Sequence, residues 1–347
     1  MRVLQIGAGS MGTRRMRDLS ALERPGDPIE IRLLDERADR RERARQQFGA
    51  VAVGDLAEGL AFDPDVLIVS TPPHQHTEFV SAALDQGCSV FCEADIWPYG
   101  IDRVRRAVEQ HPGLVAAPSA TLRFHPVVRE VARIVADEIG AVHAFGYLLS
   151  VDAAGWHPGE GVEYYARHRA TAPAREMTAF ELIALQQLFG PAARVSGLVL
   201  QRGSLDARSA EAGAEDTYAL QYRTVDGAAG QLTVVMAAPQ VARRGWIVGD
   251  RGTVHFDLLA GTVERSLPGV AEDDRVISEW SRLEEVYREE IGTFVAAVDG
   301  PTTWPYDYAE SALVCATLAA AESSMRTGRA EQVYAGLAPG PLPDTDR

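Results

Sequence analysis

The chain has 347 residues, 46% apolar and 24% charged, and its 49 acidic and 34 basic residues give a net charge of −15. This length predicts about two domains that can bury a sizeable core. The acidic balance disfavours nucleic acid and anionic membranes as partners. All 34 basic residues are arginine, which excludes a lysine general base, a Schiff-base lysine and a P-loop lysine.

The cysteines and apolar runs indicate the cellular setting. Cys88, Cys92 and Cys315 are too few for a disulfide framework and are typical of a reducing compartment. The first apolar run is too short for a signal peptide, and no run reaches the ~18 residues of a membrane span. We therefore expect a cytoplasmic protein that binds neither membrane nor nucleic acid.

The first third of the sequence alternates short β-branched runs with longer segments rich in Arg and Glu. Brief apolar runs are typical of buried parallel strands, and the segments between them have the periodicity of covering helices. This alternation predicts an α/β fold that begins with a doubly wound parallel sheet, a Rossmann domain over residues 1–121. The expected strands are Val3–Ile6, Ile29–Leu34, Val66–Ser70, Ser89–Phe91 and Leu114–Ala117, and the expected helices are Met11–Leu22, Arg37–Phe48, Gln75–Gln86 and Ile101–Gln110.

From residue 122 the pattern changes to that of an α+β domain. Runs spaced like an antiparallel meander, separated by turns such as Asp226-Gly227, predict a mostly antiparallel sheet. We expect this domain to cover residues 122–334, and residues 335–347 to form a flexible tail. The expected strands are Val142–Val151, Val195–Gln201, Thr217–Arg223, Gln231–Val235, Gly245–Val248, Thr253–Asp257 and Gly261–Arg265, and the expected helices are Pro126–Glu138, Met177–Leu188, Arg282–Val298 and Tyr308–Thr327.

A GxGxxG motif follows the first predicted strand and opens the first predicted helix. Gly7 allows a tight turn, Gly9 lets the backbone approach a pyrophosphate, and Gly12 lets the helix pack closely. Ser10 and Met11 lie at the helix N-terminus, where backbone amides favour phosphate charge. The motif in this context predicts a dinucleotide-binding site.

Asp35 ends the second predicted strand, where a carboxylate can accept hydrogen bonds from the adenosine ribose and repel a 2′-phosphate. The expected cofactor is therefore NAD, and the nearby Arg37 and Arg40 leave NADP as the alternative. Further cofactor contacts are expected after the fourth strand, because ligands bind at the carboxyl ends of strands in open sheets. The residues expected to make them are Ser70, Thr71, Pro72, His74 and His76. The two histidines have no third His or Cys close by, so no metal site is expected.

Several ordered segments together resemble the Gfo/Idh/MocA family of glucose–fructose oxidoreductases and inositol dehydrogenases. They are the glycine motif, Asp63–Val66, Thr71–His76, Ala82–Gly87, Phe91–Glu93, Arg123–Pro126, Tyr308–Leu313 and Arg326–Arg329. The resemblance implies a Rossmann domain followed by an open-faced sheet that carries the substrate and the interface of a homodimer or homotetramer. It also implies hydride transfer between NAD(P) and a sugar, sugar acid or cyclitol, with Glu93 near the cofactor.

The chain departs from the family pattern at its catalytic positions. The Glu-Lys-Pro of the family falls on Glu93-Ala94-Asp95, so alanine replaces the catalytic lysine. The family's Asp, Gly and His fall on Glu176, Thr178 and Phe180, so the carboxylate is kept and the histidine is lost. The sequence therefore indicates an atypical subgroup whose mechanism needs another proton acceptor.

Oxidation of an alcohol needs a group that takes the hydroxyl proton as the hydride leaves. Glu176 is the first candidate, because it has the position of the family's carboxylate, although a carboxylate there also suits a helix N-terminus. His157, Asp95 and Tyr165 follow as candidates. The residues expected to contact substrate are Arg123, His125, Tyr164 and Arg175, with packing, domain-tying or surface roles as their alternatives.

Three functions remain open on the sequence alone. The first is an NAD(P)-dependent oxidoreductase that acts on a sugar, sugar acid or cyclitol. The second is a redox-neutral enzyme in which bound NAD transiently oxidises a sugar to allow epimerisation, elimination or glycoside cleavage. The third is a sensor that binds dinucleotide and sugar without turnover, which the loss of both the lysine and the histidine favours.

Overall fold

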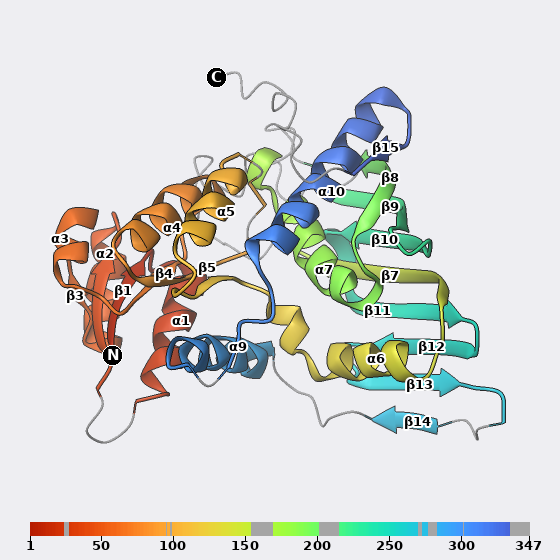
Figure 1. Ribbon diagram of the computed structural model, residues 1–347, viewed down its shortest axis with the longest axis horizontal. Helices are drawn as coiled ribbons and strands as arrows, with labels where there is room; N and C mark the ends of the chain where they lie inside the picture. The colour runs from red at the N-terminus through yellow and green to blue at the C-terminus, as the bar shows by residue number, and fades with distance from the viewer. Residues whose placement is uncertain are drawn as a thin grey trace. The chain divides into compact units, whose positions relative to one another are not determined.

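The computed structural model describes residues 1–23, 28–94, 96–97, 99–153, 169–200, 215–269, 273–276, 283–300 and 302–333. The chain divides into two compact units, which are treated one at a time (Figure 1). The first unit contains residues 1–121 and 283–312, and the second contains residues 122–282 and 313–347. Residues 283–312, which the sequence prediction assigned to the second domain, thus pack with the first unit.

The first unit is built on a parallel six-stranded sheet with the order β3-β2-β1-β4-β5-β6. The order reverses between β1 and β4, which is where a doubly wound sheet binds its ligand beyond the carboxyl ends of the strands. This sheet confirms the predicted Rossmann architecture. Its strands are β1 (Arg2–Ile6), β2 (Glu30–Leu34), β3 (Val51–Ala52), β4 (Val66–Val69), β5 (Ser89–Cys92) and β6 (Ala116–Pro118).

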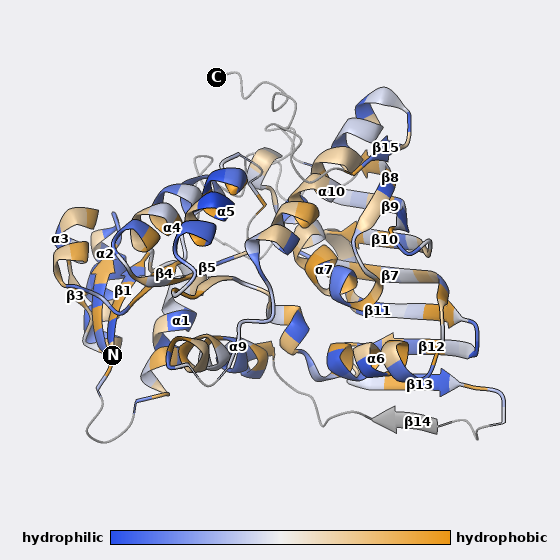
Figure 2. Cartoon of the chain, viewed as in Figure 1, coloured by the Kyte–Doolittle hydropathy of each residue, from blue (hydrophilic) through white to orange (hydrophobic). Residues whose placement is uncertain are grey.

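Helices cover both faces of the parallel sheet, so its strands are apolar on both sides. Along β4, for example, Leu67 and Val69 belong to one buried cluster and Val66 and Ile68 to the other. Figure 2 shows the result as hydrophobic strands beneath helices with hydrophilic outer surfaces, most clearly at α5. The helices of this unit are α1 (Ser10–Ser20), α2 (Ala38–Phe48), α3 (Leu56–Ala61), α4 (His76–Asp85), α5 (Ile101–Gln110) and α9 (Leu283–Val298).

The second unit contains a nine-stranded sheet with the order β14-β13-β12-β11-β7-β10-β9-β8-β15. All pairs are antiparallel except β10 with β7. The predicted large, mostly antiparallel sheet is therefore confirmed. Its strands are β7 (Val142–Asp152), β8 (Ala192–Leu200), β9 (Thr217–Thr224), β10 (Ala229–Val235), β11 (Ala237–Gly249), β12 (Gly252–Asp257), β13 (Thr262–Ser266), β14 (Asp273–Val276) and β15 (Glu331–Gln332).

Three helices, α6 (Pro126–Asp137), α7 (Pro173–Phe189) and the second part of α10 (Tyr308–Thr327), lie on one face of this sheet (Figure 1). The register shows the two faces of the strands. Phe145 and Tyr147 of β7 are buried on the helix side, whereas Leu148 points to the other side and is only partly buried. The sheet thus has one covered face and one open face.

The main differences from the sequence prediction have local physical causes. Helix α7 begins at Pro173, four residues before the predicted start, because proline suits the first helical turn. Strand β11 is 13 residues long and includes the short predicted strand, since it continues through a bulge between Ala237 and Ala242. The short elements α3, β3, β14 and β15 have too few residues to give a periodic signal.

Candidate functional site

The glycine loop after β1 has a geometry that only glycine permits. Gly7 has φ +84°, and a Cβ on it would lie 2.5 Å from the carbonyl oxygen of Ser70. A Cβ on Gly12 would lie 2.0 Å from the carbonyl oxygen of Gly7. The turn is therefore tight, and α1 packs directly against it.

Helix α1 starts at Ser10 after this turn and has the features of an anion site. Its N-cap is Gly9, which has no side chain to accept a hydrogen bond from the first amides of the helix. The first turn carries no acidic residue. The amides of Ser10 and Met11 and the helix dipole are thus suited to the pyrophosphate of a dinucleotide.

Asp35 is fixed at the carboxyl end of β2. Its Oδ2 accepts a hydrogen bond from the amide of Ala8 at 2.7 Å, and its Oδ1 accepts one from the amide of Arg37 at 2.8 Å. The guanidinium of Arg40 lies 3.9 Å from Oδ2, and the guanidinium of Arg37 pairs with Asp39. The predicted ribose-binding carboxylate is therefore tied to the glycine loop.

The segment after β4 contains a buried hydroxyl that suits a ligand. Thr71 Oγ1 is buried and has no hydrogen-bond partner among the residues that the structure describes. His76 is 2% exposed, and its Nε2 lies 2.9 Å from the carbonyl oxygen of Thr71, so this ring braces the turn. His74 is exposed, with its ring 6.1 Å from that of Trp97. Pro72 is partly buried beside Thr71.

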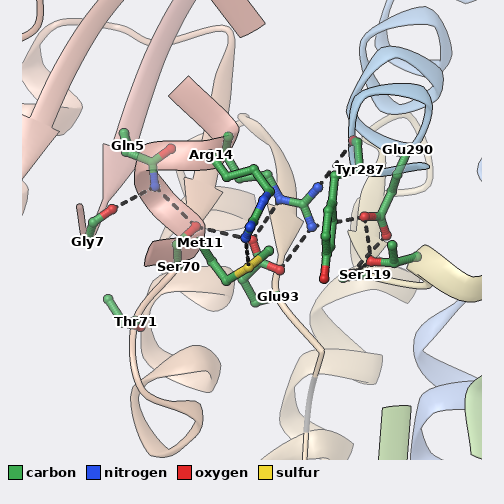
Figure 3. A network of polar contacts seen from close by, with 12 residues as sticks. Gln5, Gly7, Met11, Arg14, Ser70, Thr71, Glu93, Ser119, Tyr287 and Glu290 are labelled. Atoms are coloured by element: carbon green, nitrogen blue, oxygen red, sulfur yellow. Dashed lines mark hydrogen bonds and ion pairs between the residues drawn. The ribbon is translucent and has the colours of Figure 1, made fainter. Parts of the chain in front are cut away.

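The first unit also buries a group of charges that the sequence did not predict (Figure 3). Arg15 Nε and Nη2 donate to the two oxygens of Glu93 at 2.7 and 3.0 Å. Arg15 Nη2 also lies 2.9 Å from Glu290 Oε2. The guanidinium stands over the ring of Phe91, 4.5 Å from its centroid. We call Arg15, Glu93 and Glu290 the buried charge cluster.

Hydrogen bonds extend the buried charge cluster in two directions. Ser70 Oγ donates to Glu93 Oε1 at 3.3 Å, which connects the cluster to the end of β4. Glu290 accepts hydrogen bonds from Ser119 Oγ, the amide of Ala120 and Thr121 Oγ1 at 2.7–2.9 Å. Burial by itself lowers the pKa of Arg15, but the charges of Glu93 and Glu290 outweigh it and raise that pKa. Arg15 is thus a permanent cation.

The predicted catalytic residues have different outcomes. Ala94 is partly buried after β5. Asp95, His157, Tyr164 and Tyr165 lie outside the described residues. Glu176 lies partly buried in the first turn of α7, which fits both an acid/base role and an interaction with the helix dipole. Its catalytic role stays a prediction.

The predicted substrate contacts that the structure describes are buried in the second unit. Arg175 is 3% exposed and donates to Glu322 Oε1 at 2.7 Å. Arg123 is 6% exposed and donates to the carbonyl of Ile183. His125 is 1% exposed and accepts from the amide of Val127 as the N-cap of α6. These contacts give each side chain a structural role, and contact with substrate stays a prediction.

A buried ion pair stands beside Phe180, where the sequence resemblance predicts that a histidine has been replaced. Arg243 of β11 pairs with Glu181 of α7, which is fully buried, and its guanidinium lies 5.4 Å from the ring of Phe180. Burial, together with the charge of Arg243, lowers the pKa of His125 to about 4. No sequence pattern predicts this pair, because Glu181 and Arg243 are far apart in the chain.

In the part of the chain that the structure describes, no three His, Cys, Asp or Glu side chains gather as metal ligands would. Among the described helices, none is long and apolar enough to span a membrane.

Comparisons with known proteins agree with this architecture. Residues 1–109 match the model of the GFO_IDH_MocA family, described as an oxidoreductase family with an NAD-binding Rossmann fold. No curated protein sequence matches the chain.

Many solved structures resemble the chain. The three described here each have a sequence identity to it below 20%. Myo-inositol 2-dehydrogenase from Lactobacillus plantarum has a TM-score of 0.79 and 18% identity, and the match covers 96% of this chain and 99% of that one. Levoglucosan dehydrogenase in complex with NADH and levoglucosan has a TM-score of 0.80, 18% identity and the same coverage. An oxidoreductase from Agrobacterium radiobacter in complex with NAD+, L-tartaric acid and magnesium has a TM-score of 0.82 and 15% identity over 96% of this chain and 98% of that one. The chain therefore has the fold of these proteins over nearly its whole length, and its first 109 residues match the NAD-binding Rossmann model of this oxidoreductase family.

Proposed function

We propose that the whole chain is a Gfo/Idh/MocA oxidoreductase that transfers a hydride between NAD and a sugar, sugar acid or cyclitol. The proposal rests on the loop at the point where the strand order reverses between β1 and β4. There a turn that only glycine permits leads into the N-terminus of α1, which is suited to a phosphate. We call Gly7–Gly12, Asp35 and Thr71 together the cradle. The solved structures with the same fold include a dehydrogenase described with NADH and levoglucosan and another named for myo-inositol. They support a ring-shaped polyol as the substrate class.

The described residues of the cradle fit a dinucleotide. Thr71 Oγ1 is a buried hydroxyl without a described partner, and a ligand group at the end of β4 would satisfy it. Asp35 is held by the amides of Ala8 and Arg37, which leaves its remaining lone pairs for a ribose diol. Because a carboxylate repels a 2′-phosphate, Asp35 supports NAD over NADP even with Arg40 beside it.

The chemistry requires a proton acceptor in this chain. NAD, when bound, supplies the hydride acceptor, so the protein must orient the alcohol and take its proton. Glu176 is the proposed acceptor. It lies partly buried in the first turn of α7, and a carboxylate is one of the side chains that take up a proton in such reactions. His157, Asp95 and Tyr165 remain the next candidates.

Binding and turnover can be measured separately. Calorimetric titration of the purified protein with NAD+, NADH, NADP+ and NADPH should show the NAD forms binding more tightly. A panel of cyclitols, sugars and sugar acids should then change the absorbance of the reduced cofactor. Tight NAD binding without turnover on a broad panel would favour the sensor. Cofactor that co-purifies and returns to its original state after each turnover would favour the redox-neutral enzyme.

The Glu176→Gln variant tests the proposed acid/base residue. Replacement of a positioned proton acceptor should lower kcat by about 100-fold or more while the affinity for NAD stays within about twofold. A variant with the kcat of the native enzyme would remove Glu176 from the mechanism. The matched control is Glu78→Gln on the exposed side of α4, which should leave kcat unchanged.

We also propose that the open face of the nine-stranded sheet forms the interface of a homodimer or homotetramer. Leu198 of β8 and Val248 of β11 lie on this face with 54% and 38% exposure, although both are large apolar residues. Such side chains gain stability when a second copy covers them. Sedimentation should give a mass of two or four chains. The Leu198→Glu variant should reduce that mass, and a monomeric native protein would contradict the proposal.

A further inference from the structure

The buried charge cluster is not neutral. Arg15 carries one positive charge and faces two carboxylates, Glu93 and Glu290, so the three side chains sum to −1. The neighbouring pair Arg14–Glu284 adds nothing to this sum. Arg17 and Asp18 also pair with each other, so the excess of one negative charge remains.

Because the cluster is buried, solvent weakens the electrostatic effect of this excess charge on a nearby ligand only slightly. The side chains of Arg15 and Glu290 are 0% exposed, and that of Glu93 is 15% exposed. Solvent therefore screens the cluster weakly. Of its three side chains, only that of Glu93 reaches solvent. The next cation on α9, Arg288, is 54% exposed and thus well screened.

Glu93 is attached to the cofactor cradle by a chain of hydrogen bonds. Gln5 Nε2 donates to the carbonyl of Gly7 at 2.9 Å and lies 3.2 Å from Ser70 Oγ, which in turn donates to Glu93 at 3.3 Å (Figure 3). Glu93 itself follows β5, on the β4–β5 side of the reversal point. In doubly wound folds each half of the sheet binds one mononucleotide, and Asp35 marks the adenosine half. Glu93 therefore stands in the nicotinamide half.

We propose that the buried charge cluster discriminates between the two redox states of the cofactor by stabilising the cationic nicotinamide of NAD+. Only the oxidised ring carries a positive charge, and the anionic diphosphate is common to both forms, so a fixed negative charge near the ring favours NAD+ over NADH. Arg15 and Glu290 act as positioning residues, because the Arg15 guanidinium holds the Glu93 carboxylate in place and Glu290 holds that guanidinium. This inference rests on the proposed NAD-binding function.

Such a preference changes the reduction potential of the bound cofactor. Because the protein binds NAD+ more tightly than NADH, bound NAD+ is harder to reduce than it would be without the cluster. A tenfold preference corresponds to about 30 mV for a two-electron couple. Bound NADH is accordingly a stronger hydride donor, which favours reduction of a keto sugar over oxidation of the alcohol.

The test compares three ligands on one variant. In Glu93→Gln, a nearly isosteric change, the Kd of NAD+ should rise about tenfold, the effect of one unit charge about 10 Å away in an effective dielectric of about 20. The Kd of NADH and of ADP-ribose, which lacks the nicotinamide, should stay within about twofold. A merely structural role for Glu93 would weaken all three ligands by the same factor, and that result would overturn the proposal.

A second test variant and a control variant on α9 complete the experiment. Glu290→Gln removes the same charge from a deeper position and should raise the Kd of NAD+ relative to NADH about threefold, so it serves if Glu93→Gln fails to fold. Glu285→Gln removes an exposed carboxylate from the same helix and should leave the ratio unchanged. Equal Kd shifts for NAD+ and NADH in Glu290→Gln would overturn the proposal. If the native protein binds neither NAD+ nor NADH, the proposed function itself fails.

Discussion

Both units bury an arginine against carboxylates, but they do so with different charge balances. In the first unit Arg15 faces Glu93 and Glu290, and one carboxylate charge remains uncompensated. In the second unit Arg243 pairs with Glu181, and these two charges sum to zero. The first arrangement reaches solvent at Glu93, whereas the second is closed off between α7 and the nine-stranded sheet.

This difference separates a charge that can act on a ligand from one that only fixes the fold. A neutral buried pair can usually be exchanged for apolar side chains of similar size with little effect on stability. An uncompensated buried charge costs solvation energy and persists where something else benefits from it. We therefore expect the free energy of unfolding to change differently at the two sites when each arginine is replaced together with its carboxylate partners.

The largest expected effect is that of Arg15→Met. It leaves two carboxylates buried without their cation and should lower the free energy of unfolding by about 3–5 kcal/mol. Denaturant unfolding followed by circular dichroism measures the change. The control is Arg45→Met, which breaks an exposed pair with Glu42 and should change stability by less than about 0.5 kcal/mol. An equally small loss for Arg15→Met would show that the buried charge cluster is solvated.

Replacement of Arg243 by Met should be nearly as costly, at about 3 kcal/mol, because it leaves the Glu181 carboxylate buried without its cation. The decisive variant is Arg243→Met together with Glu181→Leu, whose stability should return to within about 1 kcal/mol of the native value. A double variant as unstable as the single one would mean that this pair, too, has a role that apolar packing cannot replace.

A smaller effect concerns the pH dependence of the second unit. The pKa of His125 is lowered to about 4, first by burial and then by Arg243, against about 6.5 in the unfolded chain. Its contribution to stability is therefore complete above pH 6.5 and is lost as the pH falls toward 4. Between pH 7 and pH 5 the loss should be about 2 kcal/mol.

The variant His125→Asn isolates this contribution, since asparagine can also cap α6. Unfolding free energies at pH 7 and pH 5 should differ by about 2 kcal/mol less in the variant than in the native protein. Identical pH slopes would show that water or an anion reaches His125 in the folded state.

The tight glycine turn and the place of Asp35 after β2 could be predicted from the sequence, because both are local features that recur in doubly wound sheets. Their contacts with a cofactor stay predictions. The buried charge cluster could not, because Arg15, Glu93 and Glu290 come from distant segments, and α9 gives no signal that it returns to the first unit. Arg175 shows the converse, since its expected role came from sequence neighbours while its partner Glu322 is far along the chain.

The smallest expected effect is that of Thr71→Val, which tests whether the Thr71 hydroxyl of the cradle binds the cofactor. Thr71→Val removes a buried hydroxyl without a described partner and keeps the side-chain volume, so the unliganded protein should lose no stability or gain up to about 1 kcal/mol. The affinity for NAD+ should nevertheless fall by about 3–10-fold, because a net hydrogen bond is worth about 1 kcal/mol. Thr317→Val provides the matched control, because its hydroxyl donates to the carbonyl of Leu313. It should lose some stability and leave the affinity for NAD+ unchanged. The opposite pattern, a destabilised Thr71→Val that binds NAD+ normally, would assign the Thr71 hydroxyl to the fold and leave the cofactor to other groups of the glycine loop.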